Sequence, residues 1–277
     1  MLRLGYHVSI ANGISLAFDR AKQEGCTAMQ IFLTNPRGWR ISYIPEEEIA
    51  AFVEKSKSFD IKPVVAHMPY LPNLASPNKS TFSKSIDSLK ANIYICNKLG
   101  IKYLVAHLGS HLGEGKEKGM KNLAEAISSV EDLLGNTMIL LENEAGQRNS
   151  IGSSMEDLSE IRRLVASKNV AFCLDTCHLF AAGYDLGNRK VLERIDREIG
   201  FKNVHLFHLN DAKYELGSCL DRHENIGLGC IGTKGFSEFF AYKGINSKPF
   251  IMETPEAGSG AEEIRIATAL ASGTPKL

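Results

Sequence analysis

The sequence predicts a closed (β/α)8 barrel, and two observations carry this prediction. Short apolar runs alternate with amphipathic segments along all 277 residues, which is typical of a parallel sheet with crossover helices. The alternation makes eight units of about 35 residues, a number and length that fit a closed barrel better than an open sheet. In addition, no Gly-x-Gly-x-x-Gly motif follows the first apolar run, which argues against a dinucleotide-binding fold. We therefore expect residues 1–277 to form one barrel domain.

The predicted strands are apolar runs of four to six residues bounded by turns, as buried parallel strands are. They are Leu4–Val8, Ala28–Leu33, Pro63–Ala66, Tyr103–Ala106, Thr137–Leu141, Val170–Leu174, Val204–Phe207 and Pro249–Met252.

The predicted helices lie between these runs. They are Ile14–Glu24, Pro45–Phe59, Thr81–Leu99, Lys118–Leu134, Ser154–Ser167, Asn188–Ile199, Gly235–Tyr242 and Ala261–Ala271. Pro45 before three glutamates favours a helix start, and Gly100 favours a helix end. Ser153 or Ser154 is a candidate cap for the fifth helix. The connection from Asn210 to Lys234 is unusually long, and loops beyond about 15 residues are commonly functional.

Composition excludes several classes of protein. Hydrophobic residues are 44% and charged residues 23% of the chain, as in ordinary globular proteins. Lys+Arg and Asp+Glu are 32 each, which argues against a strongly basic coat protein of nucleic acid but leaves DNA binding through a local patch open. Six cysteines are too few for a disulfide scaffold. With no signal peptide and no apolar run near 18 residues, we expect a cytoplasmic protein without a membrane partner.

Six of the predicted strands run directly into a histidine or a carboxylate. Because all strands of a parallel barrel point the same way, these side chains should converge at the C-terminal mouth, where barrel active sites form. The six residues are His67, His107, Glu142, Asp175, His208 and Glu253.

A cluster of this composition favours bound cations, because unpaired carboxylates gathered at one place repel each other. Imidazole and carboxylate ligands without cysteine suit zinc, and leave manganese and iron open. His178 lies three residues after Asp175, and Asp221 and His223 lie two apart in the long connection. The resulting nine ligands are too many for one zinc ion, which takes four, and suit two or three ions that share bridging ligands.

The charge of such a cluster indicates an anionic substrate. Its four carboxylates carry −4 and three divalent ions would carry +6, so the mouth would be positive. A site of this kind suits a phosphodiester as its substrate.

Three segments closely resemble the endonuclease IV family, the zinc-dependent apurinic/apyrimidinic endonucleases of DNA base-excision repair. The three segments are Asp175–Asp185, His208–Lys213 and Asp221–Gly232. Further matches extend the resemblance over essentially the whole chain: Gly5–Ser9, Asn35–Arg40, His67, His107–His111, Glu142–Gln147 and Met252–Pro255.

The resemblance implies a (β/α)8 barrel with three zinc ions and assigns the ligands. His67 and His107 would hold the first ion, and Glu142 would bridge it to the second and so act in catalysis. Asp175, His208 and Glu253 would complete the second site, and His178, Asp221 and His223 would hold the third. A hydroxide between the first two ions would attack the phosphorus on the 5′ side of an abasic sugar, while the third would stabilise the leaving 3′ oxygen. The products would be a 3′-hydroxyl and a 5′-deoxyribose phosphate.

The resemblance also implies how DNA is recognised. Loops that match Asn35–Arg40 and Tyr70-Leu71 would enter the duplex at the damaged step, with contacts from Asn35, Arg37, Tyr70 and Leu71. From the residues alone, the slightly favoured interpretation of Tyr70-Leu71 is a hydrophobic plug beneath a loop. The expected partner is double-stranded DNA with abasic sites, bound by a monomer that needs no nucleotide cofactor.

The chain departs from the family pattern at the periphery of the expected site. None of these departures removes an expected ligand, and His7, His111 and His205 receive no ligand role. The departures are Pro36 and Gly38 in place of glutamine, Leu228 in place of glutamate, Leu108 in place of proline, and Glu144 in place of a small residue.

Two other functions compete with this interpretation. A metal-dependent sugar isomerase also collects Glu, Asp and His at the strand ends of a barrel, but usually with two ions rather than three. A non-catalytic binder of damaged DNA would use structural zinc, which is normally four-coordinate and often held by cysteine. The set of His178, Asp221 and His223 favours the endonuclease.

Overall fold

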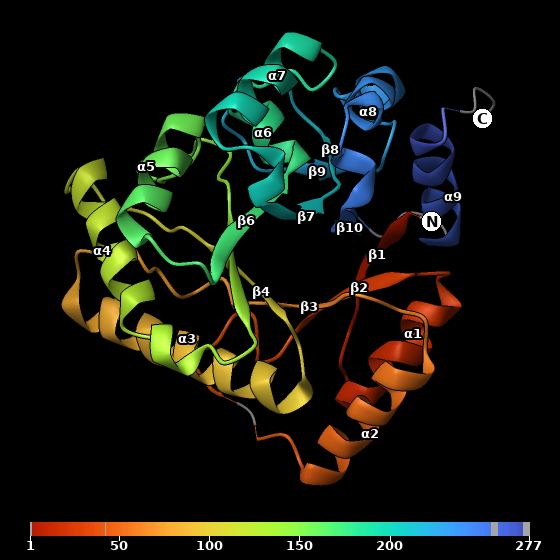
Figure 1. The fold of residues 1–277 in the computed structure, drawn as a ribbon. Coiled ribbons are helices and arrows are strands. Elements are labelled where there is room, and N and C mark those ends of the chain that lie inside the picture. Colours follow the sequence, from red (N-terminus) through yellow and green to blue (C-terminus); the bar gives the residue numbers. More distant parts are fainter. Residues whose placement is uncertain (1, 42, 256–259, 274–277) are drawn as a thin grey trace.

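A closed barrel of eight parallel strands forms the centre of the computed structural model, which describes residues 2–41, 43–255 and 260–273. The barrel order is β1-β10-β7-β6-β5-β4-β3-β2, and the pairing of β1 with β10 closes the ring. The predicted (β/α)8 fold is therefore confirmed (Figure 1). The barrel strands are β1 (Arg3–His7), β2 (Ala28–Phe32), β3 (Val64–His67), β4 (Tyr103–His107), β5 (Met138–Glu142), β6 (Val170–Asp175), β7 (Val204–His208) and β10 (Pro249–Met252).

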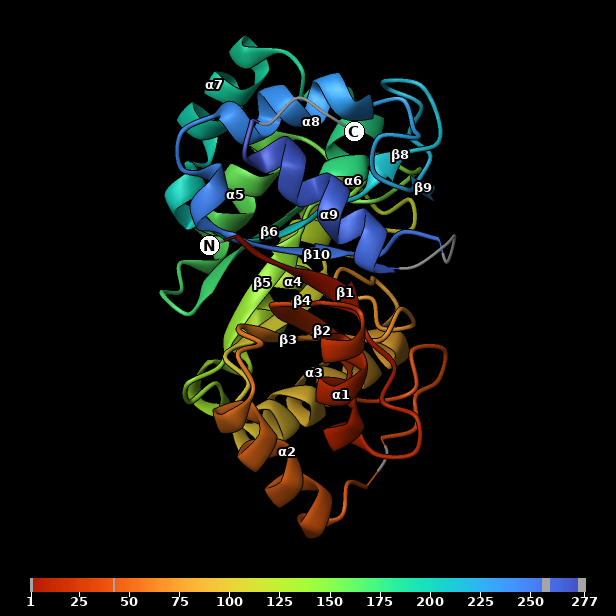
Figure 2. The same ribbon diagram turned by 90° about the vertical axis from the view of Figure 1, so that its right-hand side faces the viewer.

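Helices cover the outside of the barrel, and α9 packs against β1, so that the first and last described elements are neighbours (Figure 2). The eight outer helices are α1 (Ala17–Gln23), α2 (Glu46–Ser58), α3 (Lys79–Leu99), α4 (Lys116–Ser128), α5 (Met155–Val165), α7 (Arg189–Glu198), α8 (Gly232–Ala241) and α9 (Gly260–Ala271). Gly100 ends α3 with φ 69°, and Ser154 caps α5 by accepting a hydrogen bond from the Asp157 amide, as predicted. Among the described residues, no helix is both long and apolar enough to cross a membrane.

Several elements differ from the sequence expectation. The predicted helix Ile14–Glu24 opens as a 3-10 turn, η1 (Ile14–Leu16), and Lys118–Leu134 breaks after Ser128 before η2 (Glu131–Leu133). The short helix α6 (Thr176–Ala181) was not predicted, because it follows β6 without a loop and its residues are all buried, so it shows no amphipathic pattern. The long connection holds a small hairpin of β8 (Asp211–Ala212) and β9 (His223–Glu224). Two more 3-10 turns precede β7 and β10, η3 (Phe201–Asn203) and η4 (Ile245–Ser247).

The buried hydrophobic residues form two clusters, one on each face of the barrel sheet. The larger one packs the strands against the helices. The smaller one consists of strand residues alone, taken from all barrel strands except β1, and fills the barrel interior. Successive side chains of a strand point to opposite faces, so a residue two positions after an interior residue also points inward. Six interior residues stand two positions before a predicted ligand: Val65, Val105, Leu140, Cys173, Leu206 and Ile251. The strand pleat itself therefore aims the six ligands at the barrel axis.

Gly5 lets β1 complete the ring beside β2. Its backbone pairs with Ala28, and a Cβ atom at Gly5 would lie 1.8 Å from the Ala28 carbonyl oxygen. Because the obstacle is backbone, no side-chain movement would relieve the overlap. A larger residue at this position would separate the strands that bring His7 and Gln30 to the mouth.

Candidate metal centre

The nine predicted ligands lie together at the C-terminal end of the barrel strands. Strands β3 to β7 end at five of them, and Glu253 directly follows β10. The strand register aligns these ends, since His107 pairs with Glu142 and Asp175 pairs with His208. The remaining three come from α6 and from the long connection after β7: His178, Asp221 and His223.

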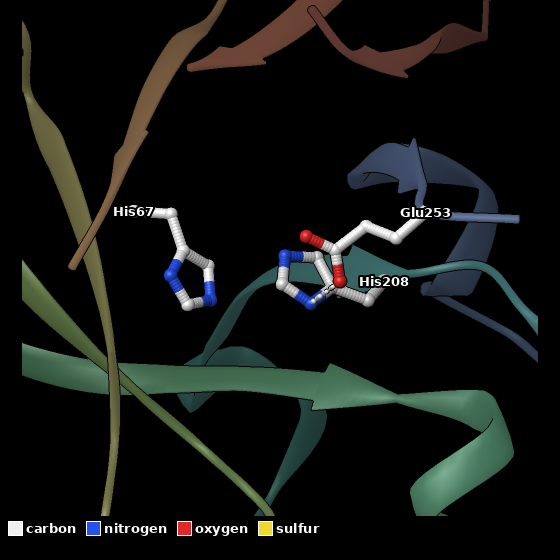
Figure 3. A group of neighbouring side chains, drawn as sticks. All are labelled: His67, His208 and Glu253. Atoms are coloured by element: carbon white, nitrogen blue, oxygen red, sulfur yellow. Dashed lines mark ion pairs between the residues drawn. The ribbon is translucent and has the colours of Figure 1, made fainter. Parts of the chain in front are cut away.

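Candidate ligand atoms within 4.8 Å of one another form five overlapping groups in the described residues, and three of these match the predicted sets. The other two are His67, His208 and Glu253, and Asp175, Cys177 and His223. Glu142 belongs to two of the predicted sets and so links the first set to the second. Figure 3 shows part of this arrangement, where the imidazole rings of His67 and His208 face each other 5.8 Å apart and the Glu253 carboxylate meets His208. The first set is His67, His107 and Glu142; the second is Glu142, Asp175, His208 and Glu253; the third is His178, Asp221 and His223.

The spacing of the ligand atoms suits zinc. Ligands about 2.0–2.1 Å from a tetrahedral zinc ion lie about 3.3 Å from each other. Asp221 Oδ1 lies 3.2 Å from His178 Nε2 and 3.4 Å from His223 Nε2. In the first set, His67 Nε2 lies 3.1 Å from Glu142 Oε2.

Two buried imidazole nitrogens of the third set also fit metal binding. His178 Nε2 and His223 Nε2 have no hydrogen-bond partner within the described part of the chain. The other nitrogen of each ring is 2.8 Å from the Asn143 carbonyl oxygen and 3.0 Å from that of Glu253, respectively. These carbonyls can accept the Nδ1 proton, so in the neutral ring, the form that binds metal, each Nε2 presents a lone pair to the shared Asp221 side.

Uncharged side chains that the sequence interpretation missed hold the carboxylates. Gln30 donates from Nε2 to Glu253 Oε1 at 2.6 Å, and its Oε1 lies 2.9 Å from His208 Nε2. Asn210 donates to Asp175 Oδ2 at 2.6 Å and accepts from the Glu253 amide at 2.8 Å. A signal for Gln30 was present in the sequence, since it is a polar residue inside an apolar run and stands two positions after Ala28.

His7 belongs to the same ring of strand ends. It is the last residue of β1, and its Nδ1 lies 3.3 Å from Glu253 Oε1 and 3.0 Å from Gln30 Nε2. Burial lowers the pKa of His7, although Glu253 opposes this shift. His7 therefore contacts a candidate ligand rather than joining one of the three sets.

Two buried carboxylates anchor the connection that carries Asp221 and His223. Asp211 accepts hydrogen bonds from backbone amides that include those of Gly227, Gly229 and Ile231, at 2.9–3.0 Å. Glu263 of α9 accepts from the amide of Ile226 at 2.7 Å and from the Tyr6 hydroxyl at 2.8 Å. The third set is thus held against the barrel by interactions outside it.

Opposite charges shift the pKa values of the centre in opposite directions. Burial would raise the pKa of Glu142, but the charges of His208 and His107 and hydrogen bonds from His208 and His67 hold it well below its usual value. The pKa of Glu253 is lowered in the same way, against burial, chiefly by His208. Burial would lower the pKa of His107, but Glu142 and Glu144 raise it to about 9.

The residues expected to contact DNA lie beside the centre. Tyr70 and Leu71 are 56% and 42% exposed, so the interpretation of this pair as a buried plug is wrong. The Tyr70 amide donates to the Pro36 carbonyl oxygen at 3.0 Å, which joins the loop of Asn35 and Arg37, both exposed, to that of Tyr70. A cavity of about 630 Å³ lies beside the ends of β1 and β10, with His7, Glu253, Tyr70 and Arg20 among its lining residues.

Comparison with known proteins identifies the family. The model of the xylose isomerase-like TIM barrel family matches residues 18–271. A probable endonuclease 4 of Cenarchaeum symbiosum is 45% identical over 98% of this chain and 100% of its own length. The crystal structure of endonuclease IV from Thermus thermophilus superposes with a TM-score of 0.87 at 33% identity, covering 98% of this chain and 99% of that one.

The chain belongs to the endonuclease IV family. It is therefore an enzyme, a hydrolase of the apurinic/apyrimidinic endonuclease class, and the family is metal-dependent. A D-tagatose 3-epimerase-like protein also superposes, with a TM-score of 0.77, 19% identity and coverage of 99% and 98% of the two chains. At that identity the likeness shows the barrel fold alone.

The pKa shifts predict how metal-free protein of this endonuclease IV family member responds to pH. A histidine whose pKa is higher in the folded than in the unfolded protein stabilises the fold when it is protonated. For His107 the unfolded pKa is 6.5 and the folded pKa about 9, so the full stabilisation is present below pH 6.5 and is lost as the pH rises to about 9. His178 and His208 act in the same direction. The lowered pKa values of Glu142 and Glu253 stabilise the fold above about 4.5 and stay constant over this range. We therefore expect the melting temperature of chelator-treated protein to fall between pH 6.5 and pH 9, measured by calorimetry.

Zinc-loaded protein is the control for this measurement. Bound metal requires neutral imidazole, so the melting temperature of the loaded form should not fall over the same interval. A metal-free melting temperature that is constant or rises from pH 6.5 to pH 9 would contradict the ion pairing described here.

Proposed function

We propose that this chain hydrolyses the phosphodiester bond 5′ to an abasic site in double-stranded DNA and leaves a 3′-hydroxyl and a 5′-deoxyribose phosphate. The observation that carries the proposal is the third set of His178, Asp221 and His223 beside two sets that share Glu142. A centre of three divalent ions with only four carboxylates has an excess of positive charge, which suits a polyanionic substrate.

The three sets correspond to the ligands of three zinc ions. Several of their atoms stand near the separation that tetrahedral zinc requires. Two of the imidazole nitrogens, His178 Nε2 and His223 Nε2, have no hydrogen-bond partner in the described structure and face carboxylates of the same cluster. Bound zinc would act as a Lewis acid toward the phosphate and would lower the pKa of a water molecule toward about 7. No separate protein base is then needed to produce the nucleophile.

The residues around the centre have distinct tasks in this proposal. Glu142 belongs to both the first and the second set, would bridge their two ions, and is the catalytic carboxylate. Gln30 and Asn210 keep Glu253 and Asp175 aimed at the axis, because each amide donates a 2.6 Å hydrogen bond to a carboxylate oxygen. Such bonds stop the carboxylates from turning away from one another when no cation separates them.

The exposed loops would open the duplex. Tyr70 and Leu71 offer apolar surface that replaces lost stacking where a base is missing, while Arg37 and Asn35 offer a charge and an amide to the backbone. Taking a nucleotide out of the stack costs least where no base pairs, which provides part of the selectivity for abasic sites. The cavity beside Tyr70 and Glu253 gives space for the displaced sugar.

A sugar isomerase on the same barrel explains less of the structure. The third set would have no function in an isomerase, and Asp211 and Glu263 would then anchor a loop that takes no part in the reaction.

We further infer that the enzyme acts in the cytoplasm as a monomer and requires no nucleotide cofactor.

Incision of a duplex that carries one tetrahydrofuran abasic analogue tests the proposal. The analogue cannot undergo β-elimination, so a cut on its 5′ side with an extendable 3′-hydroxyl demonstrates hydrolysis. We expect zinc-loaded protein to make this cut, chelation to abolish it, and Glu142→Gln to slow it on the order of 100-fold or more, because the bridging charge is lost.

Glu125→Gln is the matched control, since Glu125 is an exposed glutamate of α4 away from the mouth. It should cut as the unaltered chain does. If fully loaded, unaltered protein leaves the analogue intact, the proposal is wrong. Normal turnover by folded, fully loaded Glu142→Gln would instead reject the bridging role alone.

Replacement of Tyr70 by alanine tests the DNA-contact role. Stacking of an aromatic side chain on bases is worth about 1–3 kcal/mol, so Tyr70→Ala should weaken binding of the abasic duplex about tenfold or more without changing zinc content. Fluorescence anisotropy of the labelled duplex measures this, with Tyr94→Ala, an exposed tyrosine of α3, as the control. Equal affinities for the two variants would show that Tyr70 does not enter the duplex.

A further inference from the structure

A glycine motif precedes helix α8. Gly227, Gly229 and Gly232 form the pattern Gly-x-Gly-x-x-Gly, and α8 begins at Gly232. In nucleotide-binding proteins a motif of this kind binds phosphate, because its backbone amides converge on one point at the start of a helix. In this chain a carboxylate of the protein itself, that of Asp211, occupies that point.

Asp211 satisfies the amides of the motif from inside the protein. Its side chain is fully buried, and within the described ranges no basic side chain forms an ion pair with it. Five backbone amides donate hydrogen bonds to its two carboxylate oxygens at 2.8–3.3 Å. These are the amides of Ala212, Gly227, Gly229, Ile231 and Gly232. Burial raises the pKa of Asp211, and the amides oppose this rise.

The glycines fit this carboxylate closely. A Cβ atom at Gly229 would lie 2.5 Å from the Ala212 carbonyl oxygen and 2.6 Å from Asp211 Oδ1. Gly227 and Gly232 have φ angles of 86° and 66°, which favour glycine. The motif therefore holds the Asp211 carboxylate in a space that admits no further side chain.

Asp211 also belongs to the hairpin that carries two ligands of the third set. Strand β8 pairs with β9 in antiparallel register, which places Ala212 opposite His223, and Asp221 stands two residues before His223. A hairpin with two residues in each strand is too short to be stable alone. The Asp211 carboxylate supports it by joining β8 to residues 227–232 and the start of α8.

The third set depends on this support more than the other two sets do. The ligands of those sets end barrel strands or, in the case of Glu253, directly follow one. Asp221 and His223 lie outside the barrel sheet, and their side chains are 37% and 18% exposed. Loss of the Asp211 carboxylate would leave a group of buried amides without acceptors, which is costly. The connection that carries Asp221 and His223 would then rearrange.

We infer that Asp211 is a positioning residue for the third ion. By filling the glycine motif with its own carboxylate, it holds β9 where Asp221 and His223 meet His178. The inference rests on the proposed function for the presence of an ion at the third set. Because the ligands of the other two sets are held by the barrel sheet, loss of Asp211 weakens the binding of the third ion alone.

Zinc titration of metal-free protein against a chromophoric chelator tests this inference, with the zinc bound per chain measured by mass spectrometry. Asp211→Ala removes the carboxylate, and Gly229→Ala keeps it but places a methyl group against it. Asp196→Ala is the matched control, since Asp196 of α7 is a carboxylate that accepts a hydrogen bond from the Phe201 amide at 2.8 Å. Phe201 precedes β7, at the end of the barrel opposite the metal centre.

We expect Asp211→Ala to bind the third zinc ion about 10–100-fold more weakly, as is typical when a group that orients metal ligands is lost. The affinities of the other two ions should stay as in the unaltered chain. Excess formate should restore the third ion, because formate returns a carboxylate to the vacated amides, whereas chloride at the same ionic strength should not. Gly229→Ala should lose the third ion without rescue by formate, and Asp196→Ala should bind all three ions normally.

Unchanged affinity for all three ions in Asp211→Ala and Gly229→Ala overturns the role of Asp211. Weak third-ion binding in Asp211→Ala that formate does not restore also overturns it, since it shows a general loosening of the fold. The proposed function is judged separately, from the cut that the unaltered, loaded chain makes in the abasic duplex. If Asp211→Ala does not fold, the comparison of Gly229→Ala with Asp196→Ala decides.

Discussion

Repulsion among carboxylates at one end of the barrel is the constraint on which the site depends. Glu142, Asp175 and Glu253 come from different strands, yet their oxygens all lie within 4.8 Å of a ligand nitrogen of His208. Such a group is stable only when positive charge stands between its members. Protonated histidines provide that charge in the metal-free protein, and divalent ions provide it without protonation. The same residues therefore explain both the shifted pKa values and the affinity for metal.

Much of this site could be predicted from the sequence because a parallel barrel repeats. Each strand places its inward residues at every second position, so a histidine or carboxylate two positions after a buried valine or leucine must meet the others at the mouth. His67 and His107 are predictable on this ground, since both end apolar runs. Asp221 and His223 lie in no strand-length repeat; their spacing in the long connection made them candidate ligands, and the family resemblance assigned them to a third ion.

What could not be predicted is the uncharged framework around the ligands. Gln30 and Asn210 carry no charge, and although Gln30 stands out as a polar residue in an apolar run, their contacts with Glu253 and Asp175 appear only in the fold. Helix α6 was missed because Asp175 both ends β6 and caps the helix, leaving no turn residues to mark it. Local patterns thus indicated which side chains meet at the barrel mouth, whereas the groups that orient them depend on contacts between strands distant in sequence.

Anomalous diffraction at the zinc absorption edge, from crystals of zinc-loaded protein, tests the three-ion centre most directly. The geometry predicts three anomalous peaks, one within each set, with Glu142 contacting the first two and Asp221 contacting the third. The absence of a peak between His178, Asp221 and His223 in protein that cuts abasic DNA would contradict the central claim that catalysis here requires all three sets.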